Sequence, residues 1–258
     1  MAREKSISSN GMYKSGSVFD VKELNKIITK GYVDSGRKDG YAKKKTFSPS
    51  SVGYGNGTCP RFWYGAFNGA YFEYTKDPVS IANMNNGTKS HERIQEALEL
   101  SGVVEKLERQ LKIEDPPIMG YADLVIKWND ELLVGEIKTT SQESFGIRKS
   151  TMSVPGYHKI QLLLYMHGFG IDKGFFLYEN KNTHRILVVP IEMNDNNKKI
   201  VQETFDWMRT VRKAWEDKQP PTRSFEEDSK ECSSCPIRKA CWAGEPGIID
   251  IPVLSVPK

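Results

Sequence analysis

The sequence has no long apolar run. None of its stretches approaches the roughly 20 consecutive apolar residues that cross a bilayer, so it predicts no membrane-spanning helix and no membrane partner. The residues that follow Met1 are charged or polar and lack the apolar core of a secretory signal peptide. We therefore expect a cytoplasmic protein, in which cysteines stay reduced and favour metal binding over disulfides.

Sequence motifs of an ATP-driven motor are also missing. The segment from Gly31 to Lys38 superficially resembles a phosphate-binding loop, but Arg37 follows its second glycine and no buried strand precedes it. There is no internal repeat and no long low-complexity tract. A chain of 258 residues, 27% of them charged and 10% aromatic, can bury a substantial core. These features predict one large globular domain with extensions and exclude a helicase or ATPase motor.

Candidate contacts to nucleic acid come from an uneven distribution of charge. Residues 1–50 contain 11 Lys and Arg against five Asp and Glu, whereas the remainder is slightly acidic. A basic extension over residues 1–46 favours an anionic partner, and a solvated extension without a binding role is the alternative. The run Lys43-Lys44-Lys45 is either a phosphate contact or a solvated loop. The aromatic residues between Trp63 and Tyr74 are either core or a base-stacking surface.

The hydrophobic pattern predicts an α/β fold with a mixed central sheet flanked by helices. A two-residue turn at Asn129-Asp130 joins two apolar runs into a hairpin. Ser48 and the small residues after it indicate the start of a helix. The remaining helices are expected near residues 21–29, 81–100, 155–168 and 201–215, and the strands near 103–113, 118–128, 131–138, 175–179 and 186–191.

Two acidic residues lie inside the apolar strands of this hairpin. Glu136 and Lys138 are two positions apart and project to the same face of one strand, and Asp123 lies in the preceding strand. Two carboxylates on adjacent buried strands are costly without a partner, and a shared Mg²⁺ or Mn²⁺ is the simplest one. A nearby lysine could orient or deprotonate an attacking water. The alternative is a pair of solvated charges, which is the commoner meaning of a Glu-x-Lys pair.

Four motifs in order resemble those of the PD-(D/E)XK nuclease superfamily, and within it the RecB-like exonucleases. They are Gly87-Thr88-Lys89-Ser90-His91, Gly120-Tyr121-Ala122-Asp123, Glu136-Ile137-Lys138, and Gln161-Leu162-Leu163-Leu164-Tyr165. The resemblance extends from about Ser48 to Trp242, with one departure: no proline directly precedes Asp123. It implies a restriction-endonuclease-like core and a metal-dependent nuclease.

The resemblance also implies a role for each residue. His91, Asp123, Glu136 and the backbone carbonyl of Ile137 would be metal ligands, and Lys138 would be the catalytic lysine. Gln161 and Tyr165, one helical turn apart, would lie near the substrate. From the pattern alone His91 could equally be a core histidine, because it shares a helix face with Ile94 and Leu98, and Tyr165 could simply pack against the sheet.

The four cysteines, Cys59, Cys232, Cys235 and Cys241, are split into one remote residue and a cluster of three. Four soft thiolates suit zinc or an iron–sulfur cluster, and spacing alone does not separate these two. The split resembles the iron–sulfur nucleases, namely the CRISPR-associated RecB-like exonucleases and the AddB-type nuclease domains. It implies a 4Fe–4S cluster that closes the C-terminal cysteines onto the N-terminal helix of the nuclease core.

These observations predict a basic extension (1–46), an iron–sulfur nuclease domain (47–242) and a tail (243–258). The expected activity is metal-dependent exonuclease cleavage of DNA, in single strands or at frayed ends. The alternative is a non-hydrolysing subunit that binds DNA ends within a recombination or CRISPR adaptation complex, alongside an integrase or recombinase. A zinc-bound interaction module is a third possibility.

Overall fold

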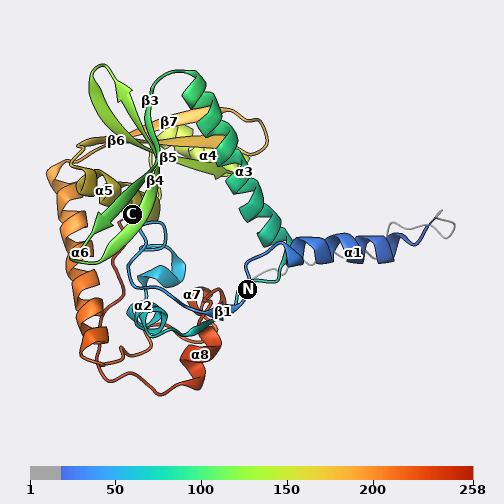
Figure 1. Ribbon diagram of the computed structural model, residues 1–258, viewed down its shortest axis with the longest axis vertical. Coiled ribbons are helices and arrows are strands. Elements are labelled where there is room, and N and C mark those ends of the chain that lie inside the picture. The colour runs from blue at the N-terminus through green and yellow to red at the C-terminus, as the bar shows by residue number, and fades with distance from the viewer. Residues whose placement is uncertain (1–18, 258) are drawn as a thin grey trace.

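The computed structural model describes residues 19–257. Its helices and strands, in order along the chain (Figure 1), are α1 (Val21–Asp34), β1 (Gly40–Tyr41), a short 3₁₀ helix η1 (Gly55–Thr58), α2 (Pro60–Phe67), β2 (Tyr71–Phe72), α3 (Pro78–Leu100), β3 (Val104–Ile113), β4 (Ile118–Trp128), β5 (Glu131–Thr140), α4 (Gln142–Thr151), α5 (Gly156–Phe169), β6 (Lys173–Asn180), β7 (Ile186–Glu192), α6 (Asp195–Glu216), α7 (Lys230–Ser233) and α8 (Arg238–Ala243). None of these helices is both long and apolar enough to cross a membrane.

The predicted mixed sheet is confirmed. Its five strands lie in the order β3-β4-β5-β6-β7, and every neighbouring pair is antiparallel except β5–β6, which is parallel. A parallel pair needs a long crossover connection, and here α4 and α5 provide it. The mixed sheet flanked by helices is consistent with a restriction-endonuclease-like fold.

The hairpin of β4 and β5 forms around the predicted turn. Asn129 and Asp130 both have positive φ, 49° and 64°, as the tight turn of a two-residue hairpin requires. Pairing runs from this turn to Leu124 opposite Gly135, and beyond that pair the two strands part. Asp123 and the segment after Gly135 therefore lie where the hairpin opens.

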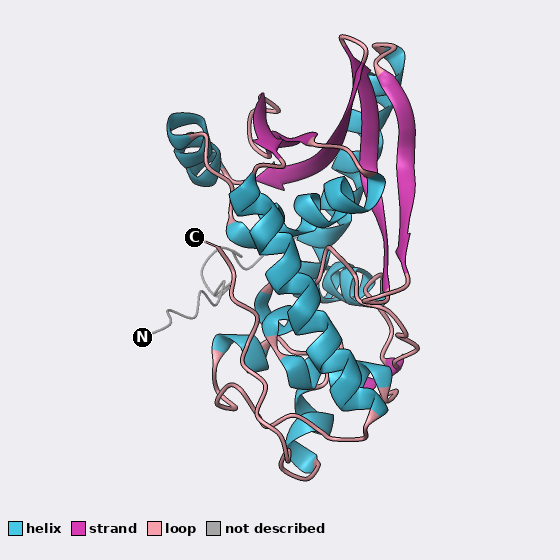
Figure 2. Cartoon of the chain, turned by 90° about the vertical axis from the view of Figure 1, so that its left-hand side faces the viewer, coloured by secondary structure: helices cyan, strands magenta, loops and turns pink. Residues whose placement is uncertain are grey.

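Helices cover both faces of the sheet (Figure 1). On one face, Ile94 of α3 packs with apolar side chains of β4, β5 and β6 in a small cluster. On the other face, α5 contacts β3, β5 and β6, and α6 packs against α5 and α2. Figure 2 shows the long strands at one end of the molecule and most of the helices gathered below them.

The N-terminal part of the fold differs from the sequence expectation at two places. The residues after Ser48 form turns instead of a helix, because Gly53 and Gly55 take positive φ values of 87° and 50°. The helix begins only at Pro60, which occupies its first turn after Cys59. Helix α4 was not expected, because Phe145 is its one buried residue and its apolar pattern is correspondingly weak.

The C-terminal cysteine segment returns to the N-terminal part of the folded body, near α2. Helices α7 and α8 contact η1 and α2 respectively, and Cys59 caps the start of α2. Farther along, the backbone N–H of Leu254 donates a 2.9 Å hydrogen bond to the carbonyl of Thr58. The expected closure of the C-terminal cysteines onto this helix is therefore present.

Helix α1 projects from the body of the molecule (Figure 1). Within the described chain it packs beside α3, and none of its residues is buried. After α1 the chain returns to the body, where β1 pairs with β2 in a two-stranded sheet. Residues 1–18, which include part of the expected basic extension, lie outside the described chain.

Candidate functional site

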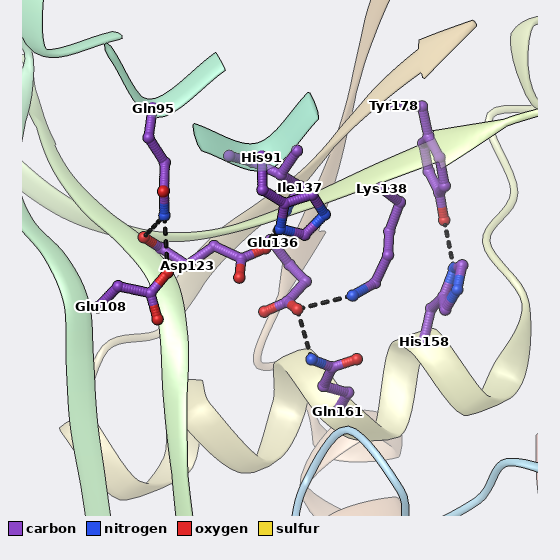
Figure 3. Close-up of polar contacts among 10 residues, drawn as sticks. All are labelled: His91, Gln95, Glu108, Asp123, Glu136, Ile137, Lys138, His158, Gln161 and Tyr178. Atoms are coloured by element: carbon purple, nitrogen blue, oxygen red, sulfur yellow. Dashed lines mark hydrogen bonds and ion pairs between the residues drawn. The ribbon is translucent and has the colours of Figure 1, made fainter. Parts of the chain in front are cut away.

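A cleft of about 510 Å³ lies where β4 and β5 part. Helix α3 supplies a histidine, β4 an aspartate, β5 a glutamate and a lysine, and α5 a glutamine, all drawn in Figure 3. Helix α5 also supplies a tyrosine. The side chains of six predicted site residues line it, namely His91, Asp123, Glu136, Lys138, Gln161 and Tyr165. The structure therefore brings these residues together from four separate elements.

Glu136 is the more deeply buried of the two carboxylates, with 1% of its surface exposed. Its Oε1 accepts a 2.7 Å hydrogen bond from Nζ of Lys138 and another from Nε2 of Gln161 (Figure 3). Its Oε2 is also buried and has no hydrogen-bond partner. An unpaired, buried carboxylate oxygen is costly, so this atom indicates that a further ligand completes the site.

Asp123 faces this group from β4. Its Oδ2 accepts a 2.7 Å hydrogen bond from the backbone N–H of Ile137 and lies 3.6 Å from Nδ1 of His91. The N–H and C=O of one residue in an extended strand point to the same side, so the Ile137 carbonyl also faces this open edge. His91, Asp123 and Glu136 therefore converge at one place, and the Ile137 backbone lies beside them.

The burial of Glu136 and its closeness to Asp123 change the ionisation of Glu136. Burial, followed by the negative charge of Asp123, raises the pKa of Glu136 to about 8. Burial opposes the charged form of Lys138, but the charges of Glu136 and Asp123 outweigh it and raise the pKa of this lysine. A bound cation would favour the ionised carboxylate and reverse the rise in the pKa of Glu136.

The α5 side of the cleft is rigid and closely packed. Tyr165 is 2% exposed, and burial together with the charges of Glu136 and Asp123 raises its pKa. A Cβ on Gly120 would lie 2.9 Å from the Tyr165 hydroxyl oxygen and 2.8 Å from Cδ of Pro49. Glycine at this position is what allows the loop, the strand and the tyrosine to approach one another so closely.

The donor set fits a hard divalent cation. Within residues 19–257, no three His, Cys, Asp or Glu side chains already stand in a metal-coordinating arrangement. Even so, Asp123, Glu136 and the Ile137 carbonyl offer oxygen atoms, which Mg²⁺ and Mn²⁺ prefer, and His91 adds one nitrogen. The unpartnered Oε2 of Glu136 is the atom that such an ion would satisfy.

The four cysteines form a second cluster away from this cleft. All are free and partly buried, and together they line one small pocket. Arg61 reaches into the cluster, where its Nε donates a 3.2 Å hydrogen bond to Sγ of Cys241. The same guanidinium also donates to the backbone carbonyl of Pro221 at 2.6 Å. A single arginine thus joins α2 to the C-terminal cysteine segment.

The environment of the thiols fits a soft metal centre. Burial raises the pKa of Cys59, and burial with the charges of the other three cysteines raises that of Cys235 to about 12. Without a metal the thiols of Cys59 and Cys235 stay protonated at neutral pH, and a metal would bind them as thiolates. The donor set suits zinc and an iron–sulfur cluster equally well.

The three lysines of the run Lys43-Lys44-Lys45 differ in their exposure to solvent. Lys44 turns inward, with Nζ 5.3 Å from the centre of the Trp63 ring and 2.8 Å from Oγ of Ser48. Lys43 and Lys45 remain exposed. Most of the aromatic stretch belongs to the core, since Trp63, Phe67 and Phe72 are buried, whereas Tyr71 is exposed.

Three further polar or aromatic residues, which do not line the cleft themselves, were not predicted from the sequence. They are Tyr54, Arg148 and His158. Nδ1 of His158 lies 3.0 Å from the hydroxyl of Tyr178 (Figure 3), and burial together with the charges of Lys138 and Arg148 lowers its pKa to about 3. The one sequence signal was Ser141, whose side chain caps the start of the helix that carries Arg148.

Comparisons with known proteins find similarity at the level of structure alone. No family model matches the chain, and no curated protein matches it. The crystal structure of SSO0001 aligns over 86% of this chain and 97% of its own, with 19% identity and a TM-score of 0.43. An alkaline exonuclease from Laribacter hongkongensis (LHK-Exo) aligns over 52% of this chain and 71% of its own, with 15% identity and a TM-score of 0.42.

The same exonuclease in complex with dAMP gives 16% identity and a TM-score of 0.42, over 53% of this chain and 70% of its own. Similarities of this size carry no argument about substrate or chemistry. The functional conclusion therefore depends on the geometry of the cleft.

Proposed function

We propose that this protein is a metal-dependent nuclease that hydrolyses phosphodiester bonds in DNA, acting as an exonuclease on single strands or frayed ends. One observation carries the proposal. Glu136 is buried beside Asp123 with Oε2 unpartnered, while its Oε1 is held by Lys138 and Gln161. This arrangement has an acidic pocket for a cation and a cationic side chain at its edge, which are the two parts that hydrolysis of a phosphodiester needs.

Each residue has a distinct role in this proposal. Asp123, Glu136, His91 and the Ile137 carbonyl would hold Mg²⁺ or Mn²⁺, which lowers the pKa of water and stabilises negative charge on the phosphate. Lys138 orients the attacking water through a hydrogen bond at Nζ, or takes a proton from that water at the same atom. Gln161 fixes the carboxylate of Glu136 through its hydrogen bond, and Tyr165 closes the back of the cleft.

A digestion assay tests the proposal. A single-stranded oligonucleotide, labelled at one end or the other, is incubated with the protein in Mg²⁺, in Mn²⁺ and in EDTA. We expect shortening of the strand in either metal and none in EDTA, and the labelled end that disappears first gives the polarity. Glu136→Gln should remove the activity. DNA binding without cleavage in either metal would favour the alternative, a non-hydrolysing DNA-end-binding subunit.

The four cysteines hold a structural 4Fe–4S cluster in the same proposal, and a zinc ion is the alternative. The supporting observation is the meeting of one remote and three clustered thiols in a single pocket. The cluster would join the start of α2 to the C-terminal segment. Protein purified without oxygen should be brown and contain iron and acid-labile sulfide. Stoichiometric zinc without iron in such material would reject the cluster.

The proposal includes a partner protein. A chain that cuts DNA ends and has no motor motif would act beside a recombination or integration protein, as in phage recombination or CRISPR adaptation. Co-purification with a defined recombinase or integrase, with and without DNA, tests this part separately from the chemistry.

A further inference from the structure

Arg148 is a half-buried cation close to the cleft. Its Nη1 donates hydrogen bonds to Oγ1 of Thr140 at 3.2 Å and to the carbonyl of Ser144 at 2.9 Å. Its guanidinium lies 4.7 Å from the centre of the Tyr178 ring. Its Nε is buried and has no hydrogen-bond partner. The side chain is therefore held in place by neutral groups that leave part of its donor capacity unused.

No carboxylate balances this charge. Within residues 19–257, Arg148 forms no ion pair, whereas Arg93, Arg209 and Arg212 each have a carboxylate within 3.0 Å. Lys138, whose register partner on β6 is the same Tyr178, is itself cationic. Holding a partly desolvated guanidinium beside another cation is unfavourable unless an anion joins them. A phosphate is the anion that an arginine fork binds best in a nucleic-acid cleft.

An aromatic pair lies beside the two cations. The rings of Tyr54 and Tyr157 are 4.9 Å apart, and Tyr54 is 60% exposed. Burial and Tyr54 raise the pKa of Tyr157, while the positive charges of Arg148 and Lys138 oppose that rise. The Tyr157 hydroxyl therefore lies in the field of both cations. An exposed ring next to a basic group is the arrangement on which unpaired bases stack.

We propose that Arg148, Tyr157 and Tyr54 form a second nucleotide subsite, which binds the phosphate adjacent to the one being cut and stacks its unpaired base on Tyr54. This inference rests on the proposed function, because it assumes that Glu136 and Lys138 mark the position of the scissile phosphate. A flat aromatic ring accepts every base, so the subsite selects unpaired nucleotides without selecting their sequence. It would thereby favour single strands and frayed ends, the substrates of the proposed function.

The sharpest test alters the DNA and leaves the protein unchanged. Binding of a short fluorescent oligothymidylate is measured by anisotropy in EDTA, with each phosphate in turn replaced by a neutral methylphosphonate. We expect one position near the bound end, next to the scissile position, at which neutralisation weakens binding about tenfold, as for loss of one charged hydrogen bond. Arg148→Gln should weaken binding by the same factor and should be insensitive to neutralisation at that position.

Two matched variants separate a specific contact from general attraction. Lys149→Gln removes the same charge from the next, exposed residue of α4 and should leave the position-specific response intact. Arg148→Lys keeps the charge but not the fork, and should restore only part of the affinity. For stacking, Tyr54→Ala should lose about tenfold in affinity. Tyr41→Ala, which removes another exposed ring, should not.

Three outcomes would each overturn the subsite. In the first, the wild-type protein does not bind the oligonucleotide. In the second, Arg148→Gln is sensitive to the same phosphate position as the wild type. In the third, Lys149→Gln loses as much affinity as Arg148→Gln. Because these measurements are made without metal, they do not depend on cleavage. If the protein shows the expected sensitivity to one neutralised phosphate but does not digest DNA in the presence of metal, the nuclease function is rejected and the DNA-binding subsite is retained.

Discussion

The backbone N–H of Ile137 donates a 2.7 Å hydrogen bond to Oδ2 of Asp123, at the point where β4 and β5 no longer pair with each other. A hydrogen bond to a side chain thus connects the two strands where the backbone hydrogen bonds between them have ended. The strands can part to form a cleft and still hold Asp123 beside Glu136. The position of the aspartate is set by the same strand that carries the other carboxylate and the lysine.

Removal of Lys138 and removal of Asp123 should have separable effects. Lys138→Ala should reduce cleavage by about 10²–10⁴-fold, as loss of a general acid–base group does, while divalent-metal binding persists. Asp123→Asn retains an oxygen that can accept from the Ile137 N–H, but it should weaken both metal binding and cleavage. Titration calorimetry with Mn²⁺ and a digestion assay measure the two effects. Equal metal affinity in wild type and Asp123→Asn would contradict the ligand assignment.

Glu136→Gln should stabilise the metal-free protein at high pH. The pKa of Glu136 is raised from the ordinary value of 4.5 to about 8 in the fold. Between these two values the folded state binds more protons than the unfolded state, so its stability falls as pH rises through this window. The glutamine variant loses this dependence. At pH 9 in EDTA, the variant does not lose the free energy of unfolding that the wild type loses when Glu136 ionises. Its melting temperature should therefore exceed that of the wild type by about 2–4 °C for each kcal/mol of this difference.

The two proteins should differ much less at pH 5, where Glu136 is protonated in the wild type as well. Thermal melting followed by circular dichroism across this pH range gives the comparison. A constant difference between wild type and variant at all pH values would show that the raised pKa of Glu136 is not its cause.

Cys59→Ser should be as damaging as Cys235→Ser, although Cys59 lies far from the other three cysteines in the sequence. Both changes remove one ligand of the proposed shared centre, so both should lower the metal content of the protein and its melting temperature. Ser233→Ala, in the same segment, serves as the control because its hydroxyl donates only to local backbone carbonyls. Metal analysis and thermal melting before and after treatment with a chelator provide the readouts. Full metal content in Cys59→Ser would remove this residue from the site.

Lys43 and Lys45 should account for any phosphate contact by the lysine run, since Lys44 is turned onto Trp63. Replacing both exposed lysines with glutamine should lower the log–log salt slope for single-stranded DNA binding by about 0.7 for each phosphate that is no longer neutralised. Catalysis at saturating DNA should change little. An unchanged slope would assign these residues to a solvated loop.

Much of the fold could be predicted because local signals agreed with the final packing. The turn at Asn129-Asp130 set the β4–β5 hairpin, and with it the approach of Asp123 to Glu136. The apolar pattern over residues 155–168 predicted a helix, which the structure has as α5, with buried side chains from Ile160 to Met166. In each case the local pattern and the tertiary environment favour the same conformation.

The parts that could not be predicted depend on contacts between distant segments. Tyr54 lies in a glycine-containing loop, and nothing local indicates that its ring would meet Tyr157. Arg148 belongs to a helix with a single buried residue, Phe145, so the periodic signal for that helix was too weak to find. The orientation of the Lys44 side chain could not be predicted either, because it depends on the tertiary contact with Trp63.

The separation of the four cysteines affects the order of events during biosynthesis. Cys59 is translated before the other three cysteines, and a long stretch of chain lies between it and Cys232. The pocket that the four thiols share cannot exist until α8 has emerged from the ribosome and docked against α2. Until then Cys59 is an unprotected thiol on a growing polypeptide. The proposed centre could therefore assemble only after the last of the four cysteines has been synthesised, and until then an oxidant can modify the lone cysteine.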